Sequence, residues 1–464
     1  MDTGDERYEF TSKAKKNLLI TIIVGLVLAV IGVIALQSGG GHQDDHGAHA
    51  EAVSNDNHSG TEDASNEHYA ADDHGDESHA DAHSHDEHSG HGDHHGSPTW
   101  LKRLYSNLWI NTVFFAGLGL IGVFFFAIQY AAQAGWSAGI KRIPLAFGSW
   151  LPIAFISMLV LFFLAGHDLF HWTHADLYNS GDHVMDKKAP FFYWPLEAGT
   201  FPAFWFIRLV LFFTVWYWLF TKLRKLALSE DLEPDTNKWF KMRGLSAIFL
   251  VFFAFSSSIA AWDWVMSIDP HWFSTMFGWY NFASWWVAGL ALTTFLVVTL
   301  KDKGYLAIVN ANHIHDLGKF VFAFSIFWTY IWFSQFLLIY YAHIPEETIY
   351  FVERWKGEYK GVFYFNLIIN FFFPFFVLMT RDSKRHARIL KVVCPAVVFG
   401  HWMDFYLMIT PGTMKYDGGF GFLEVGLIMV FLGSFLYVVL NRLAKAPLYA
   451  KNHPMLQESL HHHI

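Results

Sequence analysis

The sequence contains a single cysteine, Cys394, among its 464 residues. One thiol cannot build a disulfide framework or supply the several thiolates that hold an iron–sulfur cluster. Covalent c-type haem is also excluded, because its attachment needs a Cys-x-x-Cys-His motif. If the protein takes part in redox chemistry, the haem and iron–sulfur clusters must therefore lie on partner chains.

Charged residues are also scarce, at 16% of the sequence, whereas 53% is hydrophobic and 19% aromatic. A soluble protein of this length could not bury so much apolar surface, but helices that face lipid require it. Ten hydrophobic segments are long enough to cross a hydrocarbon core of about 30 Å as helices. They are residues 17–36, 105–132, 143–166, 201–221, 244–265, 279–300, 317–341, 361–380, 389–410 and 420–440. The sequence therefore predicts an all-α membrane protein of about ten transmembrane helices.

The positive charges indicate how these helices are oriented. With the N-terminus in the cytoplasm, 23 Lys and Arg residues fall on the cytoplasmic side, 8 fall outside and 1, Arg208, lies within a span. This bias follows the positive-inside rule, and missing one span would reverse every later loop. We therefore expect a multi-pass protein of the bacterial inner (cytoplasmic) membrane with both termini, residues 1–16 and 442–464, in the cytoplasm. For residues 17–36 we favour a retained first transmembrane helix over a cleaved signal peptide, because the apolar region is long and no clear cleavage site follows.

Lys and Arg are absent from residues 41–97, which contain 15 Asp and Glu and 13 His residues. This composition has no apolar period that could form a core, so we expect residues 37–100 to be an external low-complexity loop. We favour a solvated loop whose charge follows pH over the alternative, a tract that collects Zn²⁺ or Cu²⁺ through imidazoles and carboxylates. The candidate ligands for that alternative are His83, His85, His88, His91, His94 and His95.

Ionisable side chains inside the predicted spans need an explanation, because each costs roughly 2.5–3.5 kcal/mol near the bilayer centre. In the third span His167 and His171 are spaced by one helical turn and are expected to share a face. In the ninth span His401 and Asp404 have an i, i+3 spacing, again on one face. The full set of candidates is His167, Asp168, His171, Arg208, Asp263, His401, Asp404 and Glu424.

These candidates agree in depth. In the predicted orientation the acids and histidines fall in the outer half of the membrane, except His401, which lies near its middle. The agreement favours a proton-conducting or quinol-binding pocket open to the outer side. For His167, Asp168 and Asp263, which lie near span ends, a simple interfacial location explains the position equally well. Arg208 is better explained as the structural partner of a buried acid such as Asp263 or Glu424.

Other polar and aromatic residues of the spans have simpler explanations. We interpret Asn366, Asn370 and Gln335 as groups that form hydrogen bonds between helices. The tryptophans are expected mostly in the interfacial belt of the membrane; they are Trp262, Trp264, Trp272, Trp285 and Trp286. Intramembrane haem b is disfavoured, because His167 and His171 are expected on one helix and His401 lies deeper.

Four stretches carry a resemblance to a known family. They are FWFIRLV at 204–210, WDWVMSIDPHWFSTMFG at 262–278, FWTYIWFSQ at 327–335 and FGHWMDFY at 399–406. With them, residues 100–445 resemble the polysulfide-reductase/NrfD-type membrane subunits, and most closely the second such subunit of alternative complex III, a quinol:electron-acceptor oxidoreductase.

The resemblance implies two four-helix bundles plus flanking helices, with nine helices in an NrfD-like domain at 101–441 and no redox centre in the chain. It implies three kinds of partner: a paralogous quinol-binding subunit, an iron–sulfur subunit and c-type haem subunits. It also implies oxidation of a quinol, for example menaquinol, near the outer side of the membrane.

Three hypotheses for the function remain open at this point. In the first, the chain handles protons for a quinol-oxidising complex: Asp168, Asp263, His401 and Asp404 relay protons outward, and His167 and Arg208 tune them. The second is a cation transporter with the His-rich loop as collector, although the paired broken helices of many transporters are not evident. The third is a purely structural membrane anchor.

Overall fold

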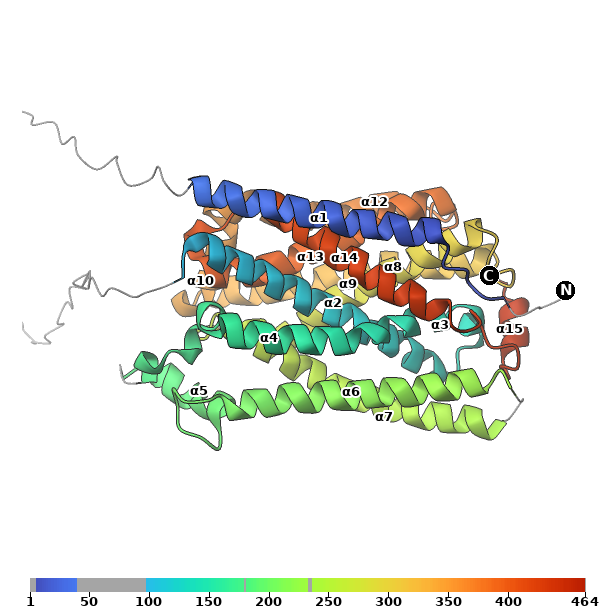
Figure 1. The fold of residues 1–464 in the computed structure, drawn as a ribbon, viewed down its shortest axis with the longest axis horizontal. Helices are drawn as coiled ribbons and strands as arrows, with labels where there is room; N and C mark the ends of the chain where they lie inside the picture. The colour runs from blue at the N-terminus through green and yellow to red at the C-terminus, as the bar shows by residue number, and fades with distance from the viewer. Residues whose placement is uncertain (1–5, 40–96, 179–180, 233–235, 464) are drawn as a thin grey trace, which may run out of the picture. The chain divides into compact units, whose positions relative to one another are not determined.

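The computed structural model describes residues 6–39, 97–178, 181–232 and 236–463. Within this part of the chain, ten helices are long and apolar enough to cross a membrane, as the sequence predicts (Figure 1). Eight of them are single helices: α1 (Ser12–Gly39), α2 (Thr99–Ala131), α6 (Ala203–Ser229), α7 (Thr236–Trp264), α8 (Phe277–Asp302), α9 (Ala311–Ala342), α13 (Ala387–Met414) and α14 (Phe422–Leu443). The third and eighth spans are composite. The protein is therefore an all-α, multi-pass membrane protein.

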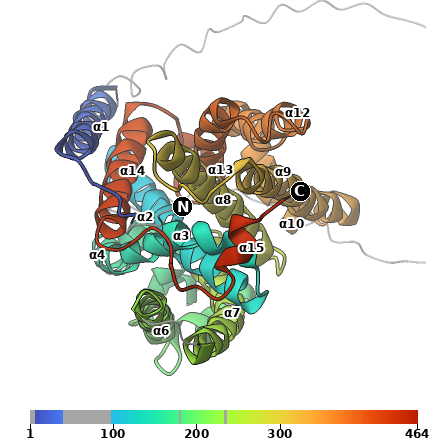
Figure 2. The same cartoon turned by 90° about the vertical axis from the view of Figure 1, so that its right-hand side faces the viewer.

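The helices form two groups of four, seen end-on in Figure 2. The first group comprises α2, the third span, α6 and α7, and the second comprises α8, α9, the eighth span and α13. Helices α2, α8 and α13 are the most buried and join the two groups, while α1 and α14 flank them. This arrangement agrees with the expected pair of four-helix bundles with flanking helices.

The third and eighth spans are interrupted close to a proline. The third consists of α3 (Arg142–Leu145), a 3₁₀ segment (Ala146–Trp150) and α4 (Leu151–Leu169). The eighth consists of α11 (Lys360–Leu367), a π-helical turn (Ile368–Phe372) and α12 (Phe373–Val377). Pro374 has no N–H with which to bond the carbonyl of Asn370, so the regular helical ladder fails there. The wider π turn is a common way to accommodate such a break and often lies at a functional site.

Helix α1 packs on α14 through small residues. A Cβ added at Gly426 would lie 2.4 Å from the backbone nitrogen of Ala29, and one added at Gly25 would lie 2.7 Å from the carbonyl oxygen of Gly426. Only glycine permits such an approach, which is the usual way that transmembrane helices come into close contact. The remaining faces of α1 are exposed and apolar, as expected for contact with lipid.

Two short amphipathic helices lie in loops where no element is predicted. These are α5 (His183–Tyr193), between the third and fourth spans, and α10 (Pro345–Trp355), between the seventh and eighth. Asp182 caps α5 by accepting hydrogen bonds from the backbone N–H groups of Val184 and Met185. Both helices are too short to appear in a search for runs of about twenty apolar residues. We call the end of the bundle that carries them the α5–α10 end.

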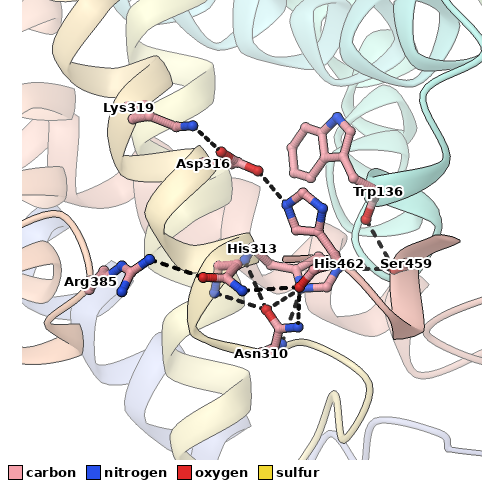
Figure 3. Close-up of polar contacts among 9 residues, drawn as sticks. Trp136, Asn310, His313, Asp316, Lys319, Arg385, Ser459 and His462 are labelled. Carbon is pink, nitrogen blue, oxygen red and sulfur yellow. Dashed lines mark hydrogen bonds and ion pairs between the residues drawn. The ribbon is translucent and has the colours of Figure 1, made fainter. Parts of the chain in front are cut away.

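The opposite end is covered by residues 444–463, and we call it the tail end. The backbone N–H of Leu448 donates to the carbonyl of Glu6, so the two described ends of the chain meet there. In Figure 3, His462 contacts Asp316 with 2.6 Å between Nε2 and Oδ2, and His313 contacts Ser459 near the short helix α15 (Leu456–Leu460). The sequence attaches no role to the terminal histidines, and the structure gives His462 a place in this packing.

The expected interfacial belt of tryptophans is wrong for four of the five residues. Trp264, Trp272, Trp285 and Trp286 are all at most 5% exposed. Trp285, for example, stacks on Phe405 of α13, with 5.4 Å between the ring centroids. These side chains fill the space between helices, because the large aromatic surface packs against protein as well as against lipid.

Candidate functional site

The eight candidate residues fall into four separate groups in the structure. His167, Asp168 and His171 line a wide cavity at the α5–α10 end, and His401 and Asp404 form a buried centre on α13. Arg208 and Asp263 form one ion pair, and Glu424 belongs to another. A similar depth in the membrane therefore does not bring these side chains into one pocket.

Asp263 on α7 forms a bidentate ion pair with Arg208 on α6. Both oxygens of the carboxylate lie 2.7 Å from guanidinium nitrogens, and both side chains are buried. The guanidinium also lies over the rings of Phe191 and Phe204, at 4.1 and 4.4 Å from their centroids. This is one of the two pairings expected for Arg208. The charge on Asp263 is neutralised, so the pair is suited to joining α6 to α7.

Glu424, at the start of α14, pairs with Arg103 of α2. Their contacts are 2.7 Å and 3.0 Å, and Glu424 also accepts hydrogen bonds from Asn107 and from the backbone N–H of Gly421. The last bond caps α14. Glu424 therefore holds the start of α14 against α2, and no feature of the sequence predicts Arg103 as its partner.

Asp404 differs from these two acids because its partners are neutral. It is 0% exposed. Its Oδ1 accepts hydrogen bonds from the Tyr280 hydroxyl and from Asn366 at 2.9 Å, and its Oδ2 accepts one from the Trp328 indole at 2.9 Å. No cationic side chain contacts it among the described residues. Burial favours the neutral acid and the three donors favour the anion, so the two influences oppose each other.

The broken eighth span places Asn366 toward Asp404. Asn370 in the π turn donates to the side-chain oxygen of Asn366 at 2.6 Å, which orients the Asn366 amide to donate to Asp404. The Asn370 amide lies so close to α13 that a Cβ added at Gly400 would be 2.2 Å from its oxygen. The expected hydrogen bond between helices is thus confirmed for Asn366, with an intramembrane carboxyl group as the acceptor, whereas Asn370 donates within its own span.

His401 lies one turn before Asp404 on the same face of α13. Its Nδ1 is 3.1 Å from the hydroxyl of Ser284, and its ring meets Trp328 edge-on at 5.4 Å. Its Nε2 is buried and has no hydrogen-bond partner among the described residues. This nitrogen is an unused polar group within the protein, next to the carboxyl centre. We refer to Asp404, His401 and their contacts Tyr280, Trp328, Asn366 and Ser284 as the Asp404 centre.

A small cavity of about 20 Å³ adjoins the Asp404 centre. Its polar lining residues are Tyr280, Trp328, Gln335, Tyr350, Arg354 and Asn366. The amide nitrogen of Gln335 is buried there without a partner among the described residues. The volume and the polar lining suit a single water molecule. The cavity therefore extends hydrogen-bonding capacity from Asp404 toward α10.

Tyr350 and Arg354 of α10 connect this small cavity to the α5–α10 end. Arg354 donates to Asp269 at 3.0 Å and lies over the ring of Tyr350, at 3.3 Å from its centroid. Asp269, on its other oxygen, is 3.4 Å from the amino group of Lys415. Burial raises the pKa of Tyr350, and Arg354 opposes that rise. Tyr350 lines both the small cavity and the wide cavity, and it is the lining residue that the two have in common.

The wide cavity has a volume of about 560 Å³, and we call it the vestibule. Ten of its eighteen lining residues are ionisable: Lys102, His167, Asp168, His171, His174, Asp269, His271, Glu346, Glu353 and Lys415. Three of the predicted residues do meet here. The histidine rings cluster, with 4.8 Å between the centroids of His167 and His174 and 5.5 Å between those of His171 and His174.

The expectation that His167 and His171 share a helix face is wrong. Helix α4 ends at Leu169, and Phe170 adopts an extended conformation. Phe170 is 0% exposed and packs edge-on against Trp109, at 5.2 Å between centroids, so its burial turns the chain away from the helix axis. His171 begins a separate 3₁₀ turn. Partial burial, and then the neighbouring His174 and His271, lower its pKa.

The sequence missed Asp269, Tyr350, Arg354 and His174. Asp269 and His271 lie inside the 262–278 stretch that carries the family resemblance, but in the loop that follows α7. The alternation of acidic and aromatic residues at 346–355 predicts an amphipathic helix, and this pattern could have drawn attention to Arg354. Only the fold could show that these loops reach the Asp404 centre.

Within the described ranges, no three His, Cys, Asp or Glu side chains are placed to hold a metal ion. The six histidines proposed as weak external ligands, His83 to His95, lie outside the described residues, so that alternative stays a prediction. Comparisons with known protein families and with curated proteins found no match to the chain.

Proposed function

We propose that this chain is a proton-handling membrane subunit of a quinol-oxidising respiratory complex, with Asp404 as the buried proton carrier. The observation that carries the proposal is the position of Asp404. It is a fully buried carboxyl group whose neutral partners line a small cavity, and that cavity shares the lining residue Tyr350 with the vestibule. Ionisable groups inside a membrane bundle are costly and commonly mark proton pathways.

The proposed route has three steps. Asp404 exchanges its proton with the Tyr280 hydroxyl or with water in the small cavity. Tyr350 passes it beyond Arg354, whose charge is held by Asp269. The carboxylates and histidines of the vestibule then receive it at the α5–α10 end. The imidazoles of His171 and His174 suit that exchange, because a neutral ring offers one nitrogen that donates and one that accepts a hydrogen bond.

We do not include Asp263 in the proton relay, although it is among the relay residues that the sequence predicts. Its bidentate contact with Arg208 stabilises the charged form, and Arg208 lines neither the small cavity nor the vestibule, whereas the partners of Asp404 line the small cavity. Arg208 is then a structural partner and not a tuning group. His167 and Asp168 keep their proposed part, as members of the vestibule.

We assign proton exchange to the vestibule because ten of its eighteen lining residues are Lys, His, Asp or Glu. In this proposal quinol, including menaquinol, is oxidised on the paralogous subunit. Electrons pass to iron–sulfur and c-type haem subunits, and this chain holds no redox centre of its own.

The assignment to an alternative complex III type assembly in the bacterial inner membrane rests on the resemblance of residues 100–445. It is supported by ten helices in two groups of four with flanking helices. It is also supported by basic residues near the tail end of the helices, such as Lys222 in α6 and Arg442 in the last turn of α14. This charge bias favours cytoplasmic termini and a vestibule on the outer side.

The test is the proton yield of the assembled complex in proteoliposomes, with Asp404→Asn compared with the matched variant Asp263→Asn. We expect Asp404→Asn to remove proton release assigned to this subunit while c-type haem and iron–sulfur subunits still copurify. Asp263→Asn, where it assembles, should retain the proton yield per quinol oxidised. An unchanged yield in Asp404→Asn would overturn the proposal, as would a purified chain that carries no such partners.

A further inference from the structure

A second polar feature lies at the tail end, between the last turns of α6 and α14 and the start of the third span. Three arginines line a shallow cleft there: Arg142, Arg224 and Arg442. Its floor is apolar and formed by Leu145, Ala146, Ala227, Leu228, Leu443, Ala446 and Pro447. The cleft lies where the spans end, which is the level expected for lipid headgroups.

One of the three arginines of this cleft is paired with an acid, and the other two are not paired with any described residue. Arg142 forms a bidentate pair with Asp231, with contacts of 3.0 and 2.9 Å. Arg224 and Arg442 form no ion pair with any described residue, although each lies within electrostatic range of the other. The Nε of Arg442 is buried and has no hydrogen-bond partner among the described residues. Two like charges and a buried donor held together in this way call for an anion.

An apolar groove runs along the same helices toward the membrane interior. It has a volume of about 340 Å³ and lies between α1, the third span and α14. Its lining includes Trp150 and Ile153 one to two turns beyond Ala146, and Val438 one turn before Arg442. The arginine cleft and the apolar groove therefore lie one after the other along the third span and α14.

We propose that the arginine cleft binds the phosphate of an anionic phospholipid whose acyl chains occupy the groove between α1, the third span and α14. Guanidinium groups recognise phosphate oxygens through paired, charge-assisted hydrogen bonds. Basic pockets between transmembrane helices commonly hold anionic headgroups for the same reason. The lipid would join the flanking helices α1 and α14 to the four-helix group that contains α6.

The proposal can be tested by the lipid that the full chain retains through purification in mild detergent, identified by native mass spectrometry. Exchange against added phosphatidylglycerol gives the affinity. We expect Arg224→Gln/Arg442→Gln to weaken retention about thirtyfold, from roughly fivefold for each cationic side chain. Neither arginine has an acidic partner to leave unpaired, so folding should survive. The matched control is Arg381→Gln/Arg388→Gln, which removes two exposed charges from the same end.

A second variant and two further ligands separate the alternatives. Ser434→Phe fills the groove without changing charge and should also weaken retention. Phosphatidylglycerol should raise the thermal midpoint of the protein, whereas phosphatidylcholine and inorganic phosphate should not. If inorganic phosphate stabilises the protein as much as phosphatidylglycerol does, the cleft is a site for a free anion and the lipid proposal is wrong. Equal retention in the arginine pair variant and its control would overturn the site itself.

Discussion

Asp263 and Asp404 are both buried carboxyl groups on membrane-spanning helices, but they are held in different ways. Asp263 faces the guanidinium of Arg208 with two contacts of 2.7 Å. Asp404 faces a phenol, an amide and an indole, all neutral. An ion pair fixes one protonation state, because the partner charge would be stranded if the acid took up a proton. Neutral donors impose no such condition.

The kind of partner distinguishes an acid with a structural role from a proton carrier better than the depth of the acid in the membrane does. The sequence places all candidate acids at a similar level of the membrane, and depth alone would assign them one role. The partners divide them: Asp263 and Glu424 each join two helices through an arginine. Asp404 instead accepts hydrogen bonds from Tyr280, Trp328 and Asn366, which line the small cavity together with Tyr350. Four substitutions can test or refine this division.

The largest expected effect belongs to Arg208. Arg208→Met should lower the free energy of unfolding by about 3–5 kcal/mol, because it leaves the carboxylate of Asp263 buried without its partner. Chemical denaturation in detergent measures the loss. The double variant Arg208→Met/Asp263→Leu should recover most of it, since both charges are then gone. If the double variant is no more stable than the single one, the ion pair is not the cause.

Glu424→Gln should have a smaller effect, of about 2 kcal/mol. The amide can still accept the bond from the Gly421 N–H that caps α14, and Arg103, with 12% of its side chain exposed, keeps some contact with its surroundings. The same denaturation series compares it with Arg208→Met. A loss equal to that of Arg208→Met would show that the two ion pairs carry equal weight.

Asp404→Asn should cost only about 1–2 kcal/mol of stability, despite the complete burial of the side chain. The asparagine oxygen still accepts one or two of the bonds, while its amide faces one donor without an acceptor. Thermal unfolding of the full chain provides the measurement, with Asn370→Asp as a contrasting change in the same contact network. A cost as large as that of Arg208→Met would indicate that Asp404 has a structural role.

The smallest effect concerns the vestibule and pH. The pKa of His171 is lowered in the folded protein by burial and by its histidine neighbours, so the unfolded chain binds the proton more readily. Stability should therefore fall as pH drops below about 6.5, the ordinary histidine pKa, by under about 1 kcal/mol. Thermal midpoints at about pH 7.5 and about pH 5.5, on either side of that pKa, measure this. His171→Asn should reduce the pH dependence and the exposed His386→Asn should not; equal slopes would contradict the assignment.

The sequence predicts the ten spans well, because a run of about twenty apolar residues has few other uses. It also predicts the Arg208–Asp263 pair as one of two choices, since a buried arginine needs an acid. It fails for Trp285 and its neighbours, because an apolar side chain does not reveal whether it faces lipid or protein. It fails for Tyr350, Arg354 and Asp269, because only the folded loops bring α10 over the Asp404 centre.

Infrared absorption of protonated carboxyl groups tests the central claim most directly. The full chain in lipid nanodiscs is titrated with pH, and the carboxyl signal is compared between the wild type, Asp404→Asn and Asp263→Asn. If Asp404 exchanges protons with the vestibule, a buried carboxyl signal should change with pH in the wild type and in Asp263→Asn, and should be missing from Asp404→Asn. A titrating signal that persists in Asp404→Asn, or one that disappears only in Asp263→Asn, would contradict the account.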